Sequence, residues 1–111
     1  MGAGASAGSS DELPRELNGC EKYDNQVAPS ATRTIVWDGT LPGQLARCMK
    51  IKAGQSVEFE GDFVEHPLIA FGGDSPNPIS SQASVSFPEP GLFGYLCTIH
   101  GSMTGAIWVV P

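Results

Sequence analysis

The chain has 111 residues, of which 41% are hydrophobic and only 16% are Asp, Glu, Lys or Arg. This length suits one domain, and the charged fraction lies below the roughly 25% typical of soluble domains. The net charge of −6 argues against nucleic acid or an anionic membrane surface as the main partner, since both select Lys and Arg. No apolar run approaches the roughly 18–20 residues that a transmembrane segment needs.

Fourteen glycines and nine prolines interrupt a chain that has no long helix-forming run. Residues 1–10 are Gly, Ala and Ser after the first Met, which is typical of a flexible linker or a remnant of cloning. We set this stretch apart from a single domain over residues 11–111. A short helical turn is predicted around residues 14–17. Strands are then predicted, in chain order, over residues 32–38, 48–52, 56–60, 63–71 (interrupted at His66 and Pro67), 83–87, 92–97 and 104–110.

Short strands separated by Gly and Pro turns indicate an all-β fold, a Greek-key sandwich or barrel of about seven or eight strands. The charges are unevenly divided along it. All six Lys and Arg residues lie within residues 1–52 together with six acids, whereas residues 53–111 hold the other six acids and no Lys or Arg. The acidic half is either an ordinary solvated surface or one that attracts a basic partner.

The three cysteines cannot all pair with one another. Cys20 and Cys48 are the preferred pair, because a bridge would fix the polar N-terminal segment, which has little apolar content, to the sandwich. The bridge would close a loop of about 29 residues and contribute roughly 3–4 kcal/mol in the chain-entropy model. Two buried free thiols are the alternative. A disulfide predicts the periplasm or the cell exterior, and the linker composition is also compatible with a membrane-tethered precursor.

Cys97, His100 and Met103 fall within one short run at the end of a predicted strand and in the loop after it. Thiolate and thioether select Cu(I), and imidazole also suits copper. Taken alone, the run slightly favours a buried thiol, a surface histidine and a core methionine over a metal site. The only other histidine, His66, lies upstream in an apolar segment and completes a His2Cys set with a weak axial Met, the ligand set of blue-copper sites.

On these residues the sequence resembles the cupredoxins, the small blue copper proteins. The resemblance runs from about Thr34 to the C-terminus and is strongest over residues 51–59, at His66 and over residues 95–105; the Cys-x2-His-x2-Met spacing is similar to that of amicyanin. It implies a soluble, monomeric one-electron carrier that cycles between Cu(II) and Cu(I) and is not an enzyme. It also implies one copper ion per chain, with four ligands: His66, Cys97, His100 and, as the axial ligand, Met103.

Two positions beside the implied ligands depart from the family pattern. Cupredoxins usually have Asn after the first His ligand, with its backbone N–H pointing at the ligating sulfur, but Pro67 has no N–H to give. Conversely, Ile99 has an N–H where plastocyanin and amicyanin have Pro. We therefore hypothesise that Ile99 donates the hydrogen bond to the sulfur of Cys97.

The resemblance also implies that electrons enter through His100. The surrounding apolar docking patch is expected to comprise Pro67, Leu68, Phe71 and Gly101, although ordinary packing would account for the same residues. The expected partner is a redox protein, either a basic c-type cytochrome attracted by the acidic half or another electron-transfer protein.

Three other functions stay open: copper storage or delivery without electron transfer, a Cys–His enzyme, and a metal-free binding module. The enzyme is disfavoured because Cys97 and His100 lie on one loop with no evident third residue to orient them. A multicopper oxidase is excluded by size and by the missing His-x-His and His-Cys-His patterns. A metal-free module would require four donors to coincide by accident.

Overall fold

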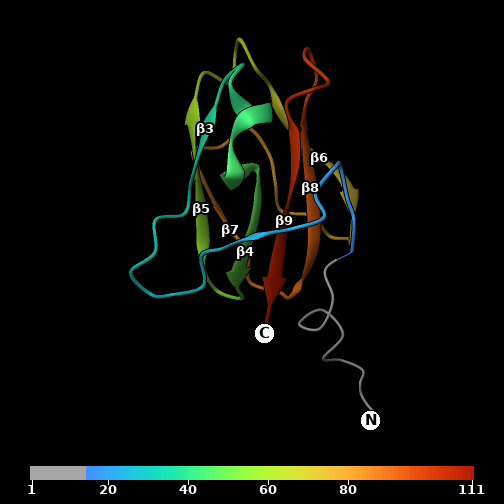
Figure 1. The fold of residues 1–111 in the computed structure, drawn as a ribbon. Coiled ribbons are helices and arrows are strands. Elements are labelled where there is room, and N and C mark those ends of the chain that lie inside the picture. Colours follow the sequence, from blue (N-terminus) through green and yellow to red (C-terminus); the bar gives the residue numbers. More distant parts are fainter. Residues whose placement is uncertain (1–14) are drawn as a thin grey trace.

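The computed structural model describes residues 15–111, so the predicted linker over residues 1–10 lies outside the described residues. The described chain forms two β-sheets and contains no α-helix (Figure 1). The larger sheet has the strand order β2 (Asp24–Asn25), β4 (Cys48–Lys52), β9 (Thr104–Val110), β8 (Gly91–Cys97), β6 (Leu68–Gly73). The smaller sheet has the order β3 (Thr34–Trp37), β5 (Ser56–Gly61), β7 (Ser84–Ser86).

The chain changes sheet at each step from β3 to β8, and two short 3-10 helices, η1 (Leu41–Gly43) and η2 (Leu45–Arg47), connect β3 to β4. Only β8 and β9 follow one another within the same sheet, as antiparallel neighbours. The predicted all-β sandwich is therefore confirmed, with eight strands in the described part of the chain. Among residues 15–111, no helix is long and apolar enough to cross a membrane.

The main core lies between the two sheets. Strand alternation sends one set of side chains inward, so that Phe93, Tyr95 and Cys97 of β8 face the residues of the smaller sheet. Trp37 and Phe59 pack against Tyr95 edge to face, with ring centroids 5.7 and 5.4 Å away. This aromatic cluster lies under the end of the sandwich at which β8 finishes.

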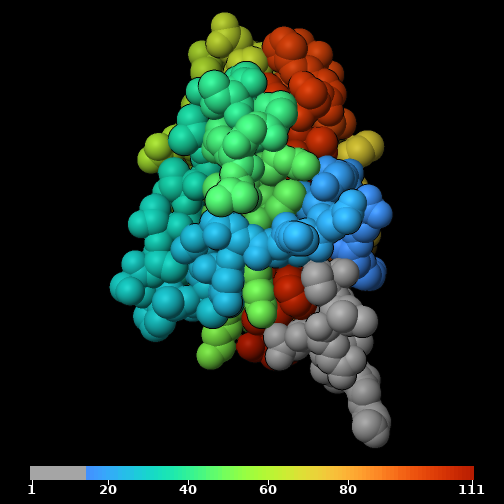
Figure 2. Space-filling model, viewed as in Figure 1, coloured from blue at the N-terminus to red at the C-terminus, as the bar shows by residue number. Residues whose placement is uncertain are grey.

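A second apolar cluster covers the outer face of the larger sheet. Residues 15–33, here called the N-terminal strap, cross this face in front of β4 and β9 (Figures 1 and 2). Tyr23 of the strap packs on Trp108 of β9 with ring centroids 5.6 Å apart, and Cys20 is bonded to Cys48. The predicted disulfide is confirmed. Because β8 and β9 are covered on both faces, neither strand carries Asp, Glu, Lys or Arg.

Two local predictions were wrong. Residues 15–17 form no helical turn; instead Leu17 and Cys20 pair across a tight turn in which Asn18 and Gly19 have φ of 51° and 82°. Asn-Gly is the dipeptide that tolerates two successive positive φ angles, which explains a hairpin here. The strand predicted over residues 63–71 begins only at Leu68, because the residues before it form a turn.

The strap is also tied to the larger sheet by an ion pair. Asp74 Oδ2 accepts hydrogen bonds from Arg15 Nη2 at 2.7 Å and from the Leu92 backbone N–H at 2.8 Å. Burial opposes the ionisation of Asp74, but these bonds outweigh it and hold the pKa of Asp74 below its ordinary value. Because the pKa of Asp74 is lower in the folded than in the unfolded protein, its ionised carboxylate stabilises the fold at any pH above the unfolded-state pKa. This stabilisation is lost as the pH falls through the folded-state pKa.

We expect Asp74→Asn to lower the free energy of unfolding by about 1 kcal/mol at pH 7, a small loss because the pair is partly exposed and screened. The difference between wild type and variant should shrink as the pH falls below about 4, the unfolded-state pKa of Asp, towards the lower folded-state pKa. Urea unfolding at pH 7, 5 and 3 measures it, with Glu60→Gln as the control for removal of an exposed acid. A difference as large at pH 3 as at pH 7 would contradict the assignment.

Candidate metal centre

The candidate site lies where β6 begins and β8 ends. These strands are antiparallel with Leu68 opposite Cys97, so the residues before β6 lie beside the residues that follow β8. His66 comes from the first group and His100 from the second. The register thus brings together two histidines that are distant in the sequence. The segments that carry them, before β6 and after β8, lie at the upper end of the sandwich in Figure 1.

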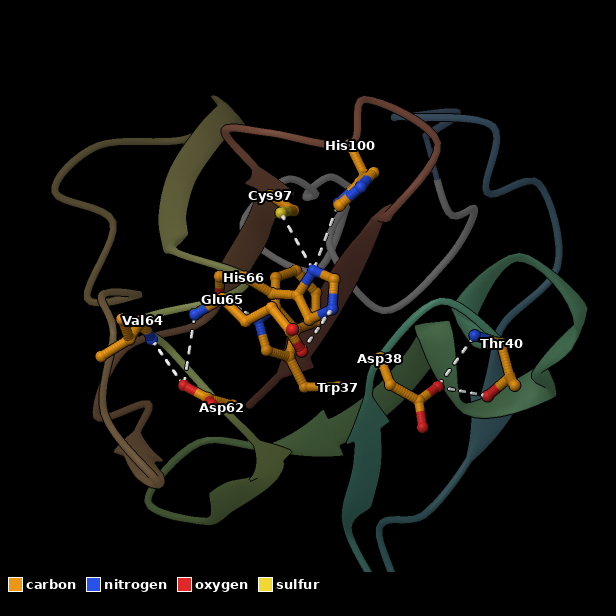
Figure 3. Close-up of polar contacts among 9 residues, drawn as sticks. All are labelled: Trp37, Asp38, Thr40, Asp62, Val64, Glu65, His66, Cys97 and His100. Carbon is orange, nitrogen blue, oxygen red and sulfur yellow. Dashed lines mark hydrogen bonds and ion pairs between the residues drawn. The ribbon is translucent and has the colours of Figure 1, made fainter.

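Three of the four predicted ligands converge. His66, Cys97 and His100 each offer one donor atom, and these three atoms lie within 4.8 Å of one another. His66 Nδ1 is 3.9 Å from Cys97 Sγ and 3.2 Å from His100 Nδ1 (Figure 3). Cys97 is the free cysteine and is fully buried, His66 is mostly buried, and His100 is exposed. The cluster therefore extends from the core to the surface.

A turn over residues 62–66 positions His66. Asp62 Oδ1 accepts hydrogen bonds from the N–H groups of Val64 and Glu65, and the Asp62 carbonyl accepts one from the N–H of His66 at 2.8 Å. An Asx turn of this kind fixes the backbone locally. From the core, the indole Nε1 of Trp37 donates to the His66 carbonyl at 2.7 Å. The backbone of His66 is thus held from two sides.

The loop between β8 and β9 carries the other predicted ligands. The N–H of Cys97 donates to the Met103 carbonyl at 2.8 Å, which closes the loop at its base, and the N–H of Met103 donates to the His100 carbonyl at 2.9 Å. Met103 is almost fully buried and belongs to the main core. The backbone of Met103 is therefore fixed next to Cys97. The role of Met103 as the axial ligand stays a prediction.

The donor set fits copper. Metal–nitrogen and metal–sulfur bonds are about 2.0–2.3 Å long, so one ion can bridge donor atoms separated by 3.2 and 3.9 Å. A thiolate with two imidazoles is a soft to borderline set that suits copper, whereas Mg²⁺ and Ca²⁺ prefer oxygen ligands. Both imidazoles present Nδ1 to the centre, and His66 Nε2 faces Glu65 Oε1 at 3.7 Å, an arrangement that orients the ring.

One carboxylate near the site is held ionised. Hydrogen bonds from the Thr40 hydroxyl and from the Thr40 N–H hold the pKa of Asp38 below its ordinary value. Glu65 Oε1 lies 3.7 Å from His66 Nε2, so a second acidic side chain lies directly beside the donor cluster. This favours a cation at the centre.

The predicted docking patch needs one correction. Leu68 is 1% exposed and packs in the main core, so it cannot form part of a surface patch. Leu68 is the first residue of β6, after Pro67 and the turn. Side chains alternate between the two faces of a strand, and the alternation begins here with Leu68 on the inner face. Gly101 and His100 are exposed and Pro67 is partly exposed. The exposed apolar side chains next to the ligands are Ile99, at 60%, and Val64, at 91%.

The hydrogen bond hypothesised from Ile99 to Cys97 stays a prediction. Within residues 15–111, the polar contact recorded for Cys97 Sγ is the one with His66 Nδ1. Pro67 contributes its carbonyl instead, which accepts a hydrogen bond from the N–H of Thr98 at 3.3 Å. This bond joins the two ligand-bearing segments directly.

The two residues that hold His66, Trp37 and Asp62, were not predicted from the sequence. An Asp at the start of a polar stretch before His-Pro is a recognisable turn signal and could have indicated Asp62. Trp37 had no such signal, because its contact with His66 joins the end of β3 to the turn before β6, 29 residues away in the sequence.

We expect Trp37→Phe to lower the free energy of unfolding by about 1–3 kcal/mol, because the His66 carbonyl loses its buried donor. The affinity for Cu(II) should fall about tenfold, as is typical when a hydrogen bond that supports a ligand is removed. Urea unfolding and competitive metal titration measure the two effects. Trp108→Phe, on the opposite face of the larger sheet, is the matched control and should leave Cu(II) affinity unchanged.

No protein-family model matches the chain, and neither does any curated protein. Among solved structures, the chain is similar to the copper-containing nitrite reductase NirK from Thermus scotoductus SA-01, with 23% identity over 60% of this chain and a TM-score of 0.49. The similar region spans only 20% of the length of the nitrite reductase chain. At this level of similarity the match carries no argument about function, which rests on the geometry of the three converging donors.

Proposed function

We propose that this protein is a one-electron carrier of the cupredoxin type, with a mononuclear copper site and no enzymatic activity of its own. The observation that carries the proposal is the convergence of the free thiol and both histidines of the chain within 4.8 Å at one end of a β-sandwich. The residues that would hold the ion are His66, Cys97, His100 and, as a weaker fourth ligand, Met103. Copper would supply the one-electron couple between Cu(II) and Cu(I).

The remaining work is done by the chain, which holds the donors still. Cys97 ends a strand that is hydrogen-bonded on both sides, and its sulfur is shielded from water. The turn from Asp62 and the indole of Trp37 hold His66. A rigid donor set rearranges little when the charge at its centre changes, which is the requirement for fast electron transfer.

His100 is the proposed electron port, because it is the exposed member of a cluster whose thiol is buried. Ile99, Val64 and Gly101 replace Leu68 as the exposed surface that a redox partner would contact. We keep an electron-transfer protein, such as a basic c-type cytochrome, as the proposed partner. The Cys20–Cys48 disulfide supports the periplasm or the cell exterior as the compartment.

The visible absorption spectrum after one equivalent of Cu(II) tests the proposal. We expect an intense blue or green thiolate-to-copper band that bleaches with ascorbate and returns on reoxidation, with one copper ion per chain. Copper bound without this band would favour storage or delivery. Absence of copper binding would favour a metal-free module.

Pro67→Asn tests how the sulfur is tuned. The substitution restores a backbone N–H next to His66, and a hydrogen bond to the thiolate stabilises the reduced state. We expect the reduction potential to rise by about 40 mV, which corresponds to roughly 1 kcal/mol for one electron. Voltammetry of wild type and variant measures it, and an unchanged or lower potential would reject the idea.

A further inference from the structure

Arg47 lies at the point where η2 ends and β4 begins, and its guanidinium joins the strap to the ligand-bearing strands. Nη1 donates to the Asn18 carbonyl at 3.2 Å and Nη2 to the Gly19 carbonyl at 3.3 Å, both in the tight turn of the strap. Nη1 also donates to the Thr104 carbonyl at 3.0 Å. One planar, multiply donating group therefore connects two parts of the chain that are far apart in sequence.

Thr104 is the residue directly after Met103 and the first residue of β9. Its hydroxyl donates to the Tyr95 carbonyl at 2.7 Å, so both its backbone and its side chain are held. Cys97 and Met103 are joined by their own hydrogen bond just beyond this point. The Arg47 contact is thus made at the base of the loop that carries the predicted ligands.

The backbone of Arg47 is held at the same place. Its carbonyl accepts a hydrogen bond from Tyr95 Oη at 2.8 Å, and burial raises the pKa of Tyr95, so the hydroxyl keeps its proton. Gly105 makes room for this bond: a Cβ there would lie 2.1 Å from the Arg47 carbonyl oxygen and 2.5 Å from Tyr95 Oη. Asn18 Nδ2 adds a second link from the strap, to the Gly105 carbonyl at 3.0 Å.

We propose that Arg47 is a positioning residue for the metal-ligand loop, coupling the disulfide-bonded strap to the place where Cys97 and Met103 are anchored. The proposal rests on the proposed function only where it takes copper to be the metal that the loop binds. The strap is then more than a cover for the sheet. It supplies the two carbonyls that orient the guanidinium, and the guanidinium holds the Thr104 carbonyl.

Arg47→Lys is the test, because it keeps the positive charge and loses the planar fork that contacts three carbonyls. In the metal-free protein, we expect amide hydrogen exchange over residues 98–104 to become about tenfold faster. After one equivalent of Cu(II), the relative heights of the thiolate-to-copper bands should change, and Cu(II) affinity should fall about tenfold. The band heights report on ligand geometry, which a merely stabilising residue would leave unchanged.

Arg33→Lys is the matched control. Arg33 Nη1 also donates to three backbone carbonyls, but these belong to Gln26, Ala28 and Ala31, all within the strap. We expect wild-type bands and wild-type exchange over residues 98–104. Asn18→Gly serves as a second variant, for the coupling of the strap to β9, if Arg47→Lys fails to fold. Glycine tolerates the positive φ and keeps the carbonyl that Arg47 contacts, and the substitution removes the side-chain hydrogen bonds to the Phe71 and Gly105 carbonyls. It should change exchange and bands in the same direction.

Wild-type exchange rates and bands in Arg47→Lys would overturn the proposal, and so would equal effects of Arg47→Lys and Arg33→Lys. If the wild-type protein gives no thiolate-to-copper band, the proposed function fails. Amide exchange in the metal-free proteins then still decides whether Arg47 holds the loop.

Discussion

In the Cys97→Ser variant, we expect the thiolate-to-copper absorption to disappear completely after addition of Cu(II). Cys97 is the free cysteine, while Cys20 and Cys48 are bonded to one another, so no other thiolate can replace it. A serine hydroxyl is a hard, protonated donor that copper does not favour. Visible absorption with one equivalent of Cu(II), before and after ascorbate, measures the loss.

Thr98→Ser is the matched control, one residue further along the same strand end, and should keep the full band. Burial of a hydroxyl in place of a thiol costs about 1–3 kcal/mol, so near-ultraviolet circular dichroism of the metal-free variant must show that it is folded. A folded Cys97→Ser protein that still turns blue would remove Cys97 from the site. A control variant that loses the band would show that the loop, rather than the sulfur, was disturbed.

The Cys20→Ala/Cys48→Ala double variant should lose about 3–4 kcal/mol of unfolding free energy, since the bridge spans 28 residues and its removal frees the unfolded chain. For a domain of this size, the melting temperature should fall by about 15–25 °C. The strap also holds the second apolar cluster against the larger sheet, and this cluster opens more easily without the bridge. Thermal and urea unfolding of the metal-free proteins measure the effect.

Reduction with dithiothreitol provides the control for this experiment. Wild type should approach the stability of the double variant in reductant, and the double variant should be insensitive to it. A loss below about 1 kcal/mol would mean that packing of Tyr23 and its neighbours, not the bridge, holds the strap.

Local sequence was enough to predict features whose cause is local. The alternation of apolar residues predicted β5 and β8 within a residue or so, because side chains two apart share a face whatever the rest of the chain does. The set of metal donors could also be predicted, since the chain has only two histidines and Cys97 lies three residues before one of them, His100. The pairing of Cys20 with Cys48 followed from the need to hold a polar segment in place.

Features that depend on register and on contacts between sheets were decided only by the tertiary structure. The burial of Leu68 follows from its place opposite Cys97 in the β6–β8 ladder, which an apolar segment cannot specify by itself. The indole of Trp37 reaches His66 only because the two sheets face one another. Arg47 reads as an ordinary cation in the sequence, yet the fold surrounds its guanidinium with carbonyls from the strap and from β9, because unpaired backbone groups near the interior require partners.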